Sequence, residues 1–111
     1  MAVAEVFRAL GDPVRLQMVR RLARSRPSTI GTVSHGLGIT RQGARKHLQV
    51  LADAKLVTLE PKGRDTLVHL SPPALEQAKA CITELERQWD ARLDALRRFL
   101  EDGEDVVTRP K

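Results

Sequence analysis

Apolar residues recur every three or four positions along most of this chain, and β-type runs replace that pattern in one stretch only. Helical spacing predicts a helix over residues 2–10, a second over 13–24 and a pair of helices within 29–54. Two short β-type runs around a Pro/Gly turn predict a hairpin over 56–70. Residues 72–101 then form one long predicted helix. The expected fold is mainly α with a small β-hairpin.

Local signals mark the ends of several predicted helices. Asp12 and Thr40 each precede a helical stretch and carry a side-chain oxygen that can cap it. The first helix of the pair is predicted over Thr29 to Leu37. Gly36 and Gly38 mark its end, where a left-handed backbone conformation costs little only for glycine. Residues 29–54 therefore form a predicted helix-turn-helix.

The second helix of this pair, over residues 40–54, has a basic polar face and an apolar face. Five long polar side chains fall within about 140° of arc: Arg41, Gln42, Arg45, Lys46 and Gln49. The opposite side carries Ala44, His47, Val50, Leu51 and Ala54. Gly43 also lies on this side, where we expect close approach of a neighbouring helix. We interpret His47 as a hydrogen-bonded structural residue.

The basic arc contains no acidic residue, which favours an anionic partner over an ordinary solvated face. Arginine can bridge O6 and N7 of guanine, and glutamine can pair with adenine. Thr40 at the helix start suits a phosphate or a base edge. We therefore expect this helix to enter the major groove of duplex DNA.

The hairpin over 56–70 directly follows the helix-turn-helix, which is the winged-helix arrangement. A two-stranded hairpin is marginal alone, so it should pack on the helices and leave its tip in solvent. The tip within 61–65 can then reach DNA phosphates beside the major groove. Turns often carry charged residues simply because they are exposed to solvent, which is the alternative explanation for this tip. We include Lys62 and Arg64 among the candidate DNA contacts.

Composition and charge narrow the class of protein. The 111 residues carry a net charge of +5, and aromatic residues make up only 3%. Residues 1–75 contain twelve Lys/Arg and five Asp/Glu, whereas residues 76–105 contain five and nine. This segregation indicates that the front of the chain meets a polyanion. We expect one domain over 1–102 and a flexible polar tail over 103–111.

The sequence shows neither of two signals that would direct the protein to a membrane or out of the cell. No apolar run approaches the roughly 20 residues that span a bilayer, and the start lacks the layout of a secretion signal. We expect a cytoplasmic protein without a membrane partner, associated with the nucleoid when bound to DNA.

The long helix over 72–101 would be about 42 Å long in its 28-residue uninterrupted part, which exceeds so small a domain. Its apolar stripe should therefore pack against another chain, in an antiparallel or crossed helix pair. Together with the helix over 2–10 it forms the predicted homodimer interface. The candidate interface residues are Val3, Val6, Phe7, Ile82, Leu85, Trp89, Leu93, Leu96 and Leu100.

Neither a metal site nor an active site emerges. The histidines His35, His47 and His69 lie on three different predicted elements, without partners at ligand spacing. Cys81 is the single cysteine, so it cannot form an internal disulfide. No nucleophile and base occur together, and there is no Gly-rich phosphate loop. We expect neither an enzyme nor a cofactor.

Several segments closely resemble the ArsR/SmtB family of bacterial winged-helix repressors. They are FRALGDPVRLQMVRRLA, TIGTVSHGLGITRQGARKHLQVLADAKLV and RQWDARLDALRRFL. The resemblance implies a homodimer that binds an imperfect palindromic operator and usually represses transcription. By the same resemblance, the basic helix is the recognition helix and Lys62 to Arg64 the wing.

This chain departs from the metal-sensing members of that family. Val33-Ser34-His35 stand where those members carry a Cys-x-Cys-type pair, and their last-helix ligand pattern is missing. The predicted function is that of a homodimeric DNA-binding repressor without a metal site, whose inducer the sequence does not name. Two alternatives stay open: a metal- or thiol-responsive repressor, and a winged helix used as a protein-interaction module.

Overall fold

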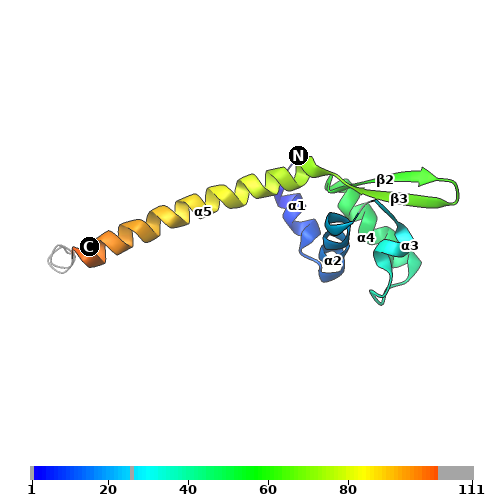
Figure 1. Ribbon diagram of the computed structural model, residues 1–111, viewed down its shortest axis with the longest axis horizontal. Coiled ribbons are helices and arrows are strands. Elements are labelled where there is room, and N and C mark those ends of the chain that lie inside the picture. The colour runs from blue at the N-terminus through cyan, green and yellow to red at the C-terminus, as the bar shows by residue number, and fades with distance from the viewer. Residues whose placement is uncertain (1, 26, 103–111) are drawn as a thin grey trace. The chain divides into compact units, whose positions relative to one another are not determined.

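The structure is a computed structural model that describes residues 2–25 and 27–102. Its helices are α1 (Val3–Leu10), α2 (Pro13–Arg24), α3 (Ile30–Ser34), α4 (Arg41–Asp53) and α5 (Pro72–Glu101) (Figure 1). Its strands are β1 (Ser28–Thr29), β2 (Val57–Lys62) and β3 (Asp65–Leu70). The predicted mainly helical winged helix-turn-helix with a long last helix is confirmed.

The chain divides into two compact units, and the division falls inside α5. Residues up to Ala78 form the first unit, and the described residues from Lys79 onward form the second. The sequence pattern predicts one domain over 1–102, because the uninterrupted α5 gives no sign of a boundary. The predicted tail over 103–111 lies outside the described residues.

The sheet has three antiparallel strands in the order β1-β3-β2, rather than the two of the predicted hairpin. In the added strand, Ser28 pairs with Val68 and Thr29 pairs with Leu67. A strand of two residues is too short to show alternation, so no sequence pattern could reveal it. Thr29 also caps α3, because its Oγ1 accepts the N–H of Thr32 at 3.2 Å. One residue therefore ties the start of the helix-turn-helix to the sheet.

The wing turn is tighter than the sequence pattern predicts. Pro61 and Lys62 belong to β2, where they pair with Thr66 and Asp65 of β3. Only two residues remain for the turn, and Gly63 takes a positive φ of 63°. Two-residue hairpin turns need such a conformation, which glycine adopts without steric cost.

The core of the first unit takes apolar side chains from every one of its helices and from the sheet. Its largest fully buried members are Val6, Met18, Val33, Leu48, Leu51, Leu56, Val57 and Val68. Ala74 and Ala78 at the start of α5 are buried in it as well. Among the described residues, no polar or charged side chain is buried. The fold therefore rests on aliphatic packing.

The apolar face of α4 is turned relative to the predicted one. Ala44, Leu48 and Leu51 are fully buried, whereas Val50, which the sequence interpretation places inside, is 40% exposed. The three buried residues span about 60° of arc, and Val50 lies about 130° from their centre. The prediction for Val50 is wrong because the packing partners of α4, not its composition alone, set the buried arc.

Gly43 also has a different role from the expected one. A Cβ at this position would lie 3.2 Å from Oγ1 of Thr40, not against a neighbouring helix. That same Oγ1 accepts the N–H of Gly43 at 2.9 Å and caps α4, as predicted for Thr40. The glycine therefore leaves room for the cap.

The predicted Asp12 cap is confirmed and makes α2 sensitive to pH. Oδ1 of Asp12 accepts the N–H of Arg15 at 3.1 Å and of Val14 at 2.8 Å. The hydrogen bond from Arg15 is the largest cause that lowers the pKa of Asp12 below its ordinary 3.8, while partial burial opposes the shift. Since the folded pKa lies below the unfolded one, the stabilisation is complete above about pH 5 and is lost as pH falls through the folded pKa.

Asp12→Asn should therefore reduce the pH dependence of stability in acid. Asparagine caps a helix about as well but does not titrate here. The difference in unfolding free energy between wild type and variant should shift against the wild type as the pH falls from about 5 to about 3. Urea unfolding at several pH values measures this difference. A difference that stays constant over the range would contradict the role given to Asp12.

Candidate nucleic-acid interface

The turn between α3 and α4 sets the direction of the basic helix. Gly36 and Gly38 have φ values of 75° and 72°, in the left-handed region that glycine occupies readily. Helix α3 ends at Ser34, before the predicted Leu37, and Thr40 then caps α4. A short first helix and a glycine turn therefore present the polar face of α4 to solvent.

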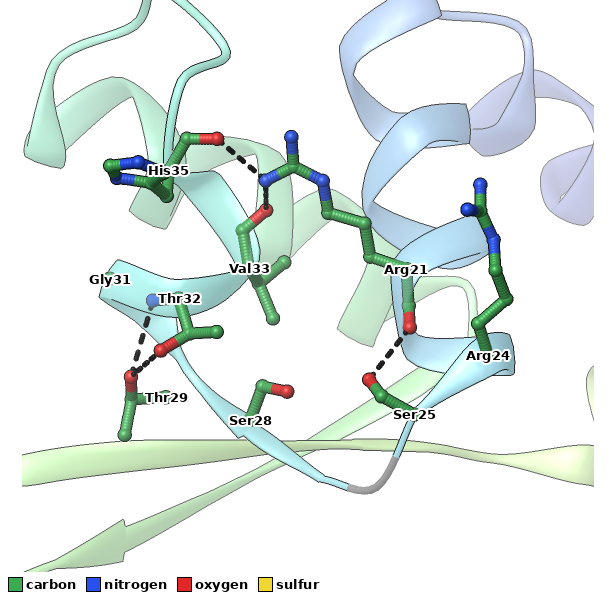
Figure 2. Close-up of a pocket in the computed structure, with 9 residues that line it drawn as sticks. All are labelled: Arg21, Arg24, Ser25, Ser28, Thr29, Gly31, Thr32, Val33 and His35. Carbon is green, nitrogen blue, oxygen red and sulfur yellow. Dashed lines mark hydrogen bonds between the residues drawn. The ribbon is translucent and has the colours of Figure 1, made fainter.

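An arginine on α2 holds the end of α3, and sequence reasoning missed it. Nη1 of Arg21 donates to the carbonyl oxygens of Val33 at 3.0 Å and His35 at 2.7 Å (Figure 2). Carbonyls at a helix C-terminus lack intrahelical partners, so a cation there is favourable. Nothing in the periodicity marks Arg21, because its partners are backbone atoms far along the chain.

A second arginine on α2 fixes α4 from the other side. Nε of Arg15 donates to the carbonyl of Ala9 at 2.7 Å, and its Nη1 lies 3.2 Å from Nδ1 of His47. The hydrogen-bonded structural role predicted for His47 is confirmed. Arg15 thus connects α1, α2 and α4, and Arg21 adds α3 to the same framework.

Three predicted DNA-binding residues meet in one depression of about 250 Å³. Arg41 and Arg45 come from the first half of α4, and Arg64 comes from the wing turn. They share it with residues of β1, α3 and β3: Thr29, Ile30, Gly31, Ser34, Asp65 and Thr66. None of the three arginines forms an ion pair with a carboxylate in the described part of the chain. We call this depression the arginine cleft.

The arginine cleft has the chemistry of a phosphate site. Three arginines and a single acid, Asp65, line it, together with the hydroxyl residues Thr29, Ser34 and Thr66. Arginine and hydroxyl groups make many of the protein contacts to DNA phosphates. Sequence reasoning missed the three hydroxyl residues because each is local to a different element.

The structure does not gather the remaining predicted contacts into the cleft. Gln42 and Lys46 are exposed on α4, and Lys62 is exposed at the end of β2. Gln49, also exposed, donates from Nε2 to Oδ1 of Asp53 at 2.9 Å, one turn further along the helix. On α4, the candidates therefore divide into arginines beside the wing and polar side chains on the open face.

Comparisons with known proteins agree with this geometry. Residues 10–60 match a family described as a helix-turn-helix domain. The helix-turn-helix-type transcriptional regulator YuzN of Bacillus subtilis (strain 168), itself uncharacterized, is 38% identical over 65 residues, covering 53% of this chain and 71% of that protein. A solved ArsR-like transcriptional regulator from Rhodococcus sp. RHA1 is 27% identical, with a TM-score of 0.70 over 86% of this chain and 90% of that one.

A second solved structure, of an ArsR family transcriptional regulator, shares the fold with a TM-score of 0.72 at 23% identity, covering 78% of this chain and 94% of that one. The chain belongs to the ArsR family of helix-turn-helix transcriptional regulators. In this ArsR-family regulator, α3 and α4 form the helix-turn-helix and β2 and β3 the wing.

The histidines of the regulator lie apart on separate elements. His35 follows α3, His47 contacts Arg15, and Nε2 of His69 lies 2.7 Å from Oε1 of Glu60 across the wing. Within residues 2–25 and 27–102, no group of three His, Cys, Asp or Glu could hold a metal ion. Cys81 is a free, half-buried thiol. None of the helices in the described part has the length and hydropathy needed to cross a bilayer.

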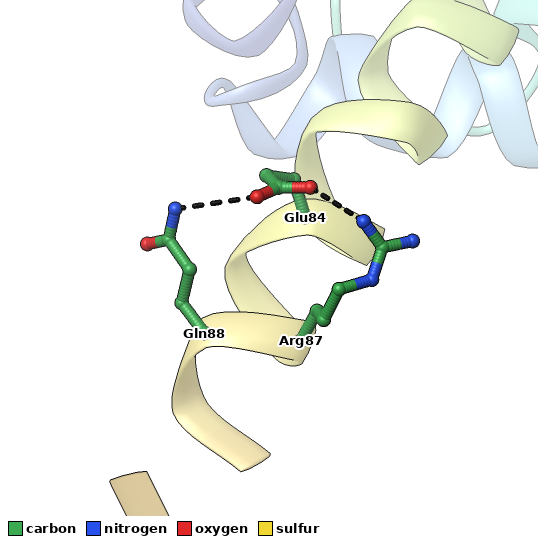
Figure 3. A network of polar contacts seen from close by, with 3 residues as sticks. All are labelled: Glu84, Arg87 and Gln88. Carbon is green, nitrogen blue, oxygen red and sulfur yellow. Dashed lines mark hydrogen bonds and ion pairs between the residues drawn. The ribbon is translucent and has the colours of Figure 1, made fainter. Parts of the chain in front are cut away.

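The part of α5 from Ile82 onward carries a stripe of exposed large apolar side chains. Seven of them are between 38% and 66% exposed: Ile82, Leu85, Trp89, Leu93, Leu96, Phe99 and Leu100. Away from the stripe, Glu84 binds Arg87 at 2.8 Å and Gln88 at 3.4 Å (Figure 3). These polar side chains form hydrogen bonds with one another within the helix. The apolar side chains of the stripe stay exposed to water.

The three predicted interface residues on α1 differ in how accessible their side chains are. Val6 is fully buried in the core of its own chain, so its side chain offers no surface to a second chain. Phe7 and Val3 are only half-buried. The helical spacing of α1 identified its apolar face. It could not show that the core of the same chain already buries Val6 on that face.

Proposed function

We propose that this regulator is a homodimeric repressor of transcription that binds a palindromic operator. The observation that carries the proposal is the arginine cleft, in which Arg41 and Arg45 of α4 meet Arg64 of the wing. A phosphate running between recognition helix and wing would contact all three. Helix α4 would then lie in the major groove, with the wing residues 61–65 on the adjacent backbone.

The polar residues of α4 lie in two places, and we assign a different DNA contact to each. Arg41 and Arg45 line a recess shared with the wing, which fits a backbone phosphate. Gln42, Lys46 and Gln49 lie on the open face, where side chains can reach base edges in the groove. Phosphate contacts would fix the position of α4, and base contacts would supply the sequence preference. Thr40 keeps its structural role as the cap, which leaves its methyl group and backbone for DNA contact.

The stripe on α5 supports the homodimer. Six of its residues, from Ile82 to Leu100, follow the 3.6-residue repeat of a straight helix over about five turns. An exposed apolar stripe of this length is unfavourable in water, and a second copy of the same helix has the matching shape. Val3 and Phe7, half-buried on α1, remain candidate interface residues. A twofold dimer would place two α4 helices about one DNA turn, roughly 34 Å, apart.

Repression is the expected outcome of such binding, because a dimer on an operator occupies DNA that other proteins must reach. The family resemblance of the sequence supports this direction. The alternative role as a protein-interaction module requires no sequence preference on DNA, so a binding experiment separates the two.

Selection of duplexes from a random-sequence pool by the purified protein tests the proposal. We expect an enriched imperfect palindrome that the protein binds at least a thousandfold more tightly than a scrambled duplex, as specific regulators typically do. Competition with the scrambled duplex at fixed salt measures the ratio. Enrichment of no sequence, with equally weak binding to every duplex, would contradict operator binding and favour the interaction module.

A further inference from the structure

A second depression, larger than the arginine cleft, lies between the end of α2, strand β1 and helix α3. It measures about 680 Å³, which is in the range of small-molecule sites. Arg21 and Arg24 border it from α2, and His35 borders it from the end of α3 (Figure 2). Hydroxyl groups of Ser25, Thr29 and Thr32 complete much of the lining. We call it the α2–α3 pocket.

The α2–α3 pocket has hydrogen-bond donors and positive charge but no acidic side chain in its lining. In the described part of the chain, neither Arg21 nor Arg24 forms an ion pair with a carboxylate. Arg21 makes both of its carbonyl hydrogen bonds through one nitrogen, Nη1. Arg24 is exposed one turn away on the same helix face, so two guanidinium groups border one opening.

We propose that the α2–α3 pocket binds a small organic anion carrying a carboxylate or phosphate group. Planar guanidinium groups bind both anions with charge-assisted, often paired, hydrogen bonds. The pocket is larger than an inorganic ion needs, so the ligand carries an organic part that fills the remainder. The hydroxyl of Thr32, whose oxygen accepts a hydrogen bond from Oγ1 of Thr29 at 3.1 Å, would donate its own proton to the anion.

Occupancy of this pocket should weaken DNA binding, a consequence that rests on the proposed function. Thr29 and Gly31 line both the α2–α3 pocket and the arginine cleft, so the two sites share a wall. An anion would compete with the carbonyls of Val33 and His35 for the guanidinium of Arg21. Release of these carbonyls loosens the end of α3, which packs against α4.

A backbone phosphate of the bound DNA is a second candidate occupant of this pocket. In that case the pocket would extend the DNA interface and no separate ligand would be needed. The two candidate occupants predict different behaviour of the free protein. Only a small-molecule site binds a small organic anion saturably without DNA.

Amide chemical shifts of the free dimer, titrated with phenyl phosphate, benzoate and uncharged benzamide at constant ionic strength, test the site. We expect saturable shifts near residues 21–35 with at least one anion and none with benzamide. Arg24→Gln should weaken anion binding about tenfold, because it removes a charged hydrogen-bond donor. The matched variant Arg20→Gln removes an exposed arginine of α2 outside the pocket and should leave the affinity unchanged. Absence of saturable shifts, or equal shifts with benzamide, would overturn the proposal.

Duplex binding then tests the coupling and the DNA source. With the anion at saturation, affinity for the selected duplex should fall several-fold in the wild type and less in Arg24→Gln. Unchanged affinity would overturn the coupling. A lower DNA affinity with a smaller salt dependence in Arg24→Gln, without anion binding by the wild type, would assign the pocket to backbone phosphate instead. If no duplex is selected at all, the proposed function fails. The titration of the free protein still shows whether the pocket binds an anion.

Discussion

Replacement of Arg41 and Arg45 together by alanine is expected to weaken DNA binding roughly a thousandfold. The two substitutions remove four cations from a dimer, and each would otherwise neutralise one phosphate. Because binding to DNA releases about 0.9 counterion per neutralised phosphate, the slope of log affinity against log salt should decrease by about 3.6. Fluorescence anisotropy of a labelled duplex between low and moderate salt measures both quantities.

The fold should survive this double substitution, because both arginines are exposed. The matched control is Arg8→Ala with Arg20→Ala, which removes the same charge from exposed positions of α1 and α2 outside the arginine cleft. We expect the control to bind DNA within a few-fold of the wild type. A loss confined to the selected duplex, with binding to random duplex intact, would show that Arg41 and Arg45 read bases and not phosphates.

Trp89→Glu should convert the dimer to a monomer. Each dimer contains two copies of Trp89, and a buried aromatic residue at an interface often contributes 2 kcal/mol or more, so the dissociation constant should rise about a thousandfold or more. The new carboxylate would also have to leave water. Sedimentation equilibrium measures the dimer–monomer balance, and affinity for the selected duplex should fall with it because one half-site remains per protein.

Ala91→Glu is the matched control, since it places the same charge on α5 about 160° from the centre of the stripe. It should sediment as the wild type does. Trp89 is 59% exposed in the single chain, so its replacement should leave the first compact unit folded. A Trp89→Glu protein that stays dimeric at micromolar concentration would refute the α5 stripe as the interface.

The helix starts could be predicted from sequence because their causes are local. Asp12 and Thr40 cap helices within three residues of themselves, and Gly36 and Gly38 adopt conformations that other residues resist. The hairpin could be found for the same reason, from alternation and a turn. Each of these features depends on neighbours in the chain.

Features that depend on distant partners could not be predicted. Strand β1 exists because β3 lies beside it, and Arg21 matters because the carbonyl of Val33 ends a helix packed against α2. Val50 is exposed although its helical position predicted burial, because the neighbours of α4 select which arc is covered. Apolar content alone does not contain this information.

The candidate site was predictable in part. The angular positions of Arg41 and Arg45 followed from helical geometry, and Arg64 followed from the hairpin. That the three line one depression, together with Thr29 and Thr66, required the tertiary structure. The apolar stripe on α5 was likewise visible in the sequence, whereas the burial of Val6 within its own chain was not.

The central claim is that two copies of this helix-turn-helix, held together by α5, read two half-sites of one operator. A series of duplexes with the selected palindrome and with 5 base pairs inserted between its half-sites tests it most directly. The insertion rotates one half-site by about half a turn of the helix. We predict that it lowers affinity to that of a duplex with a single half-site, and affinity that stays unchanged by the insertion would contradict the dimeric winged-helix account.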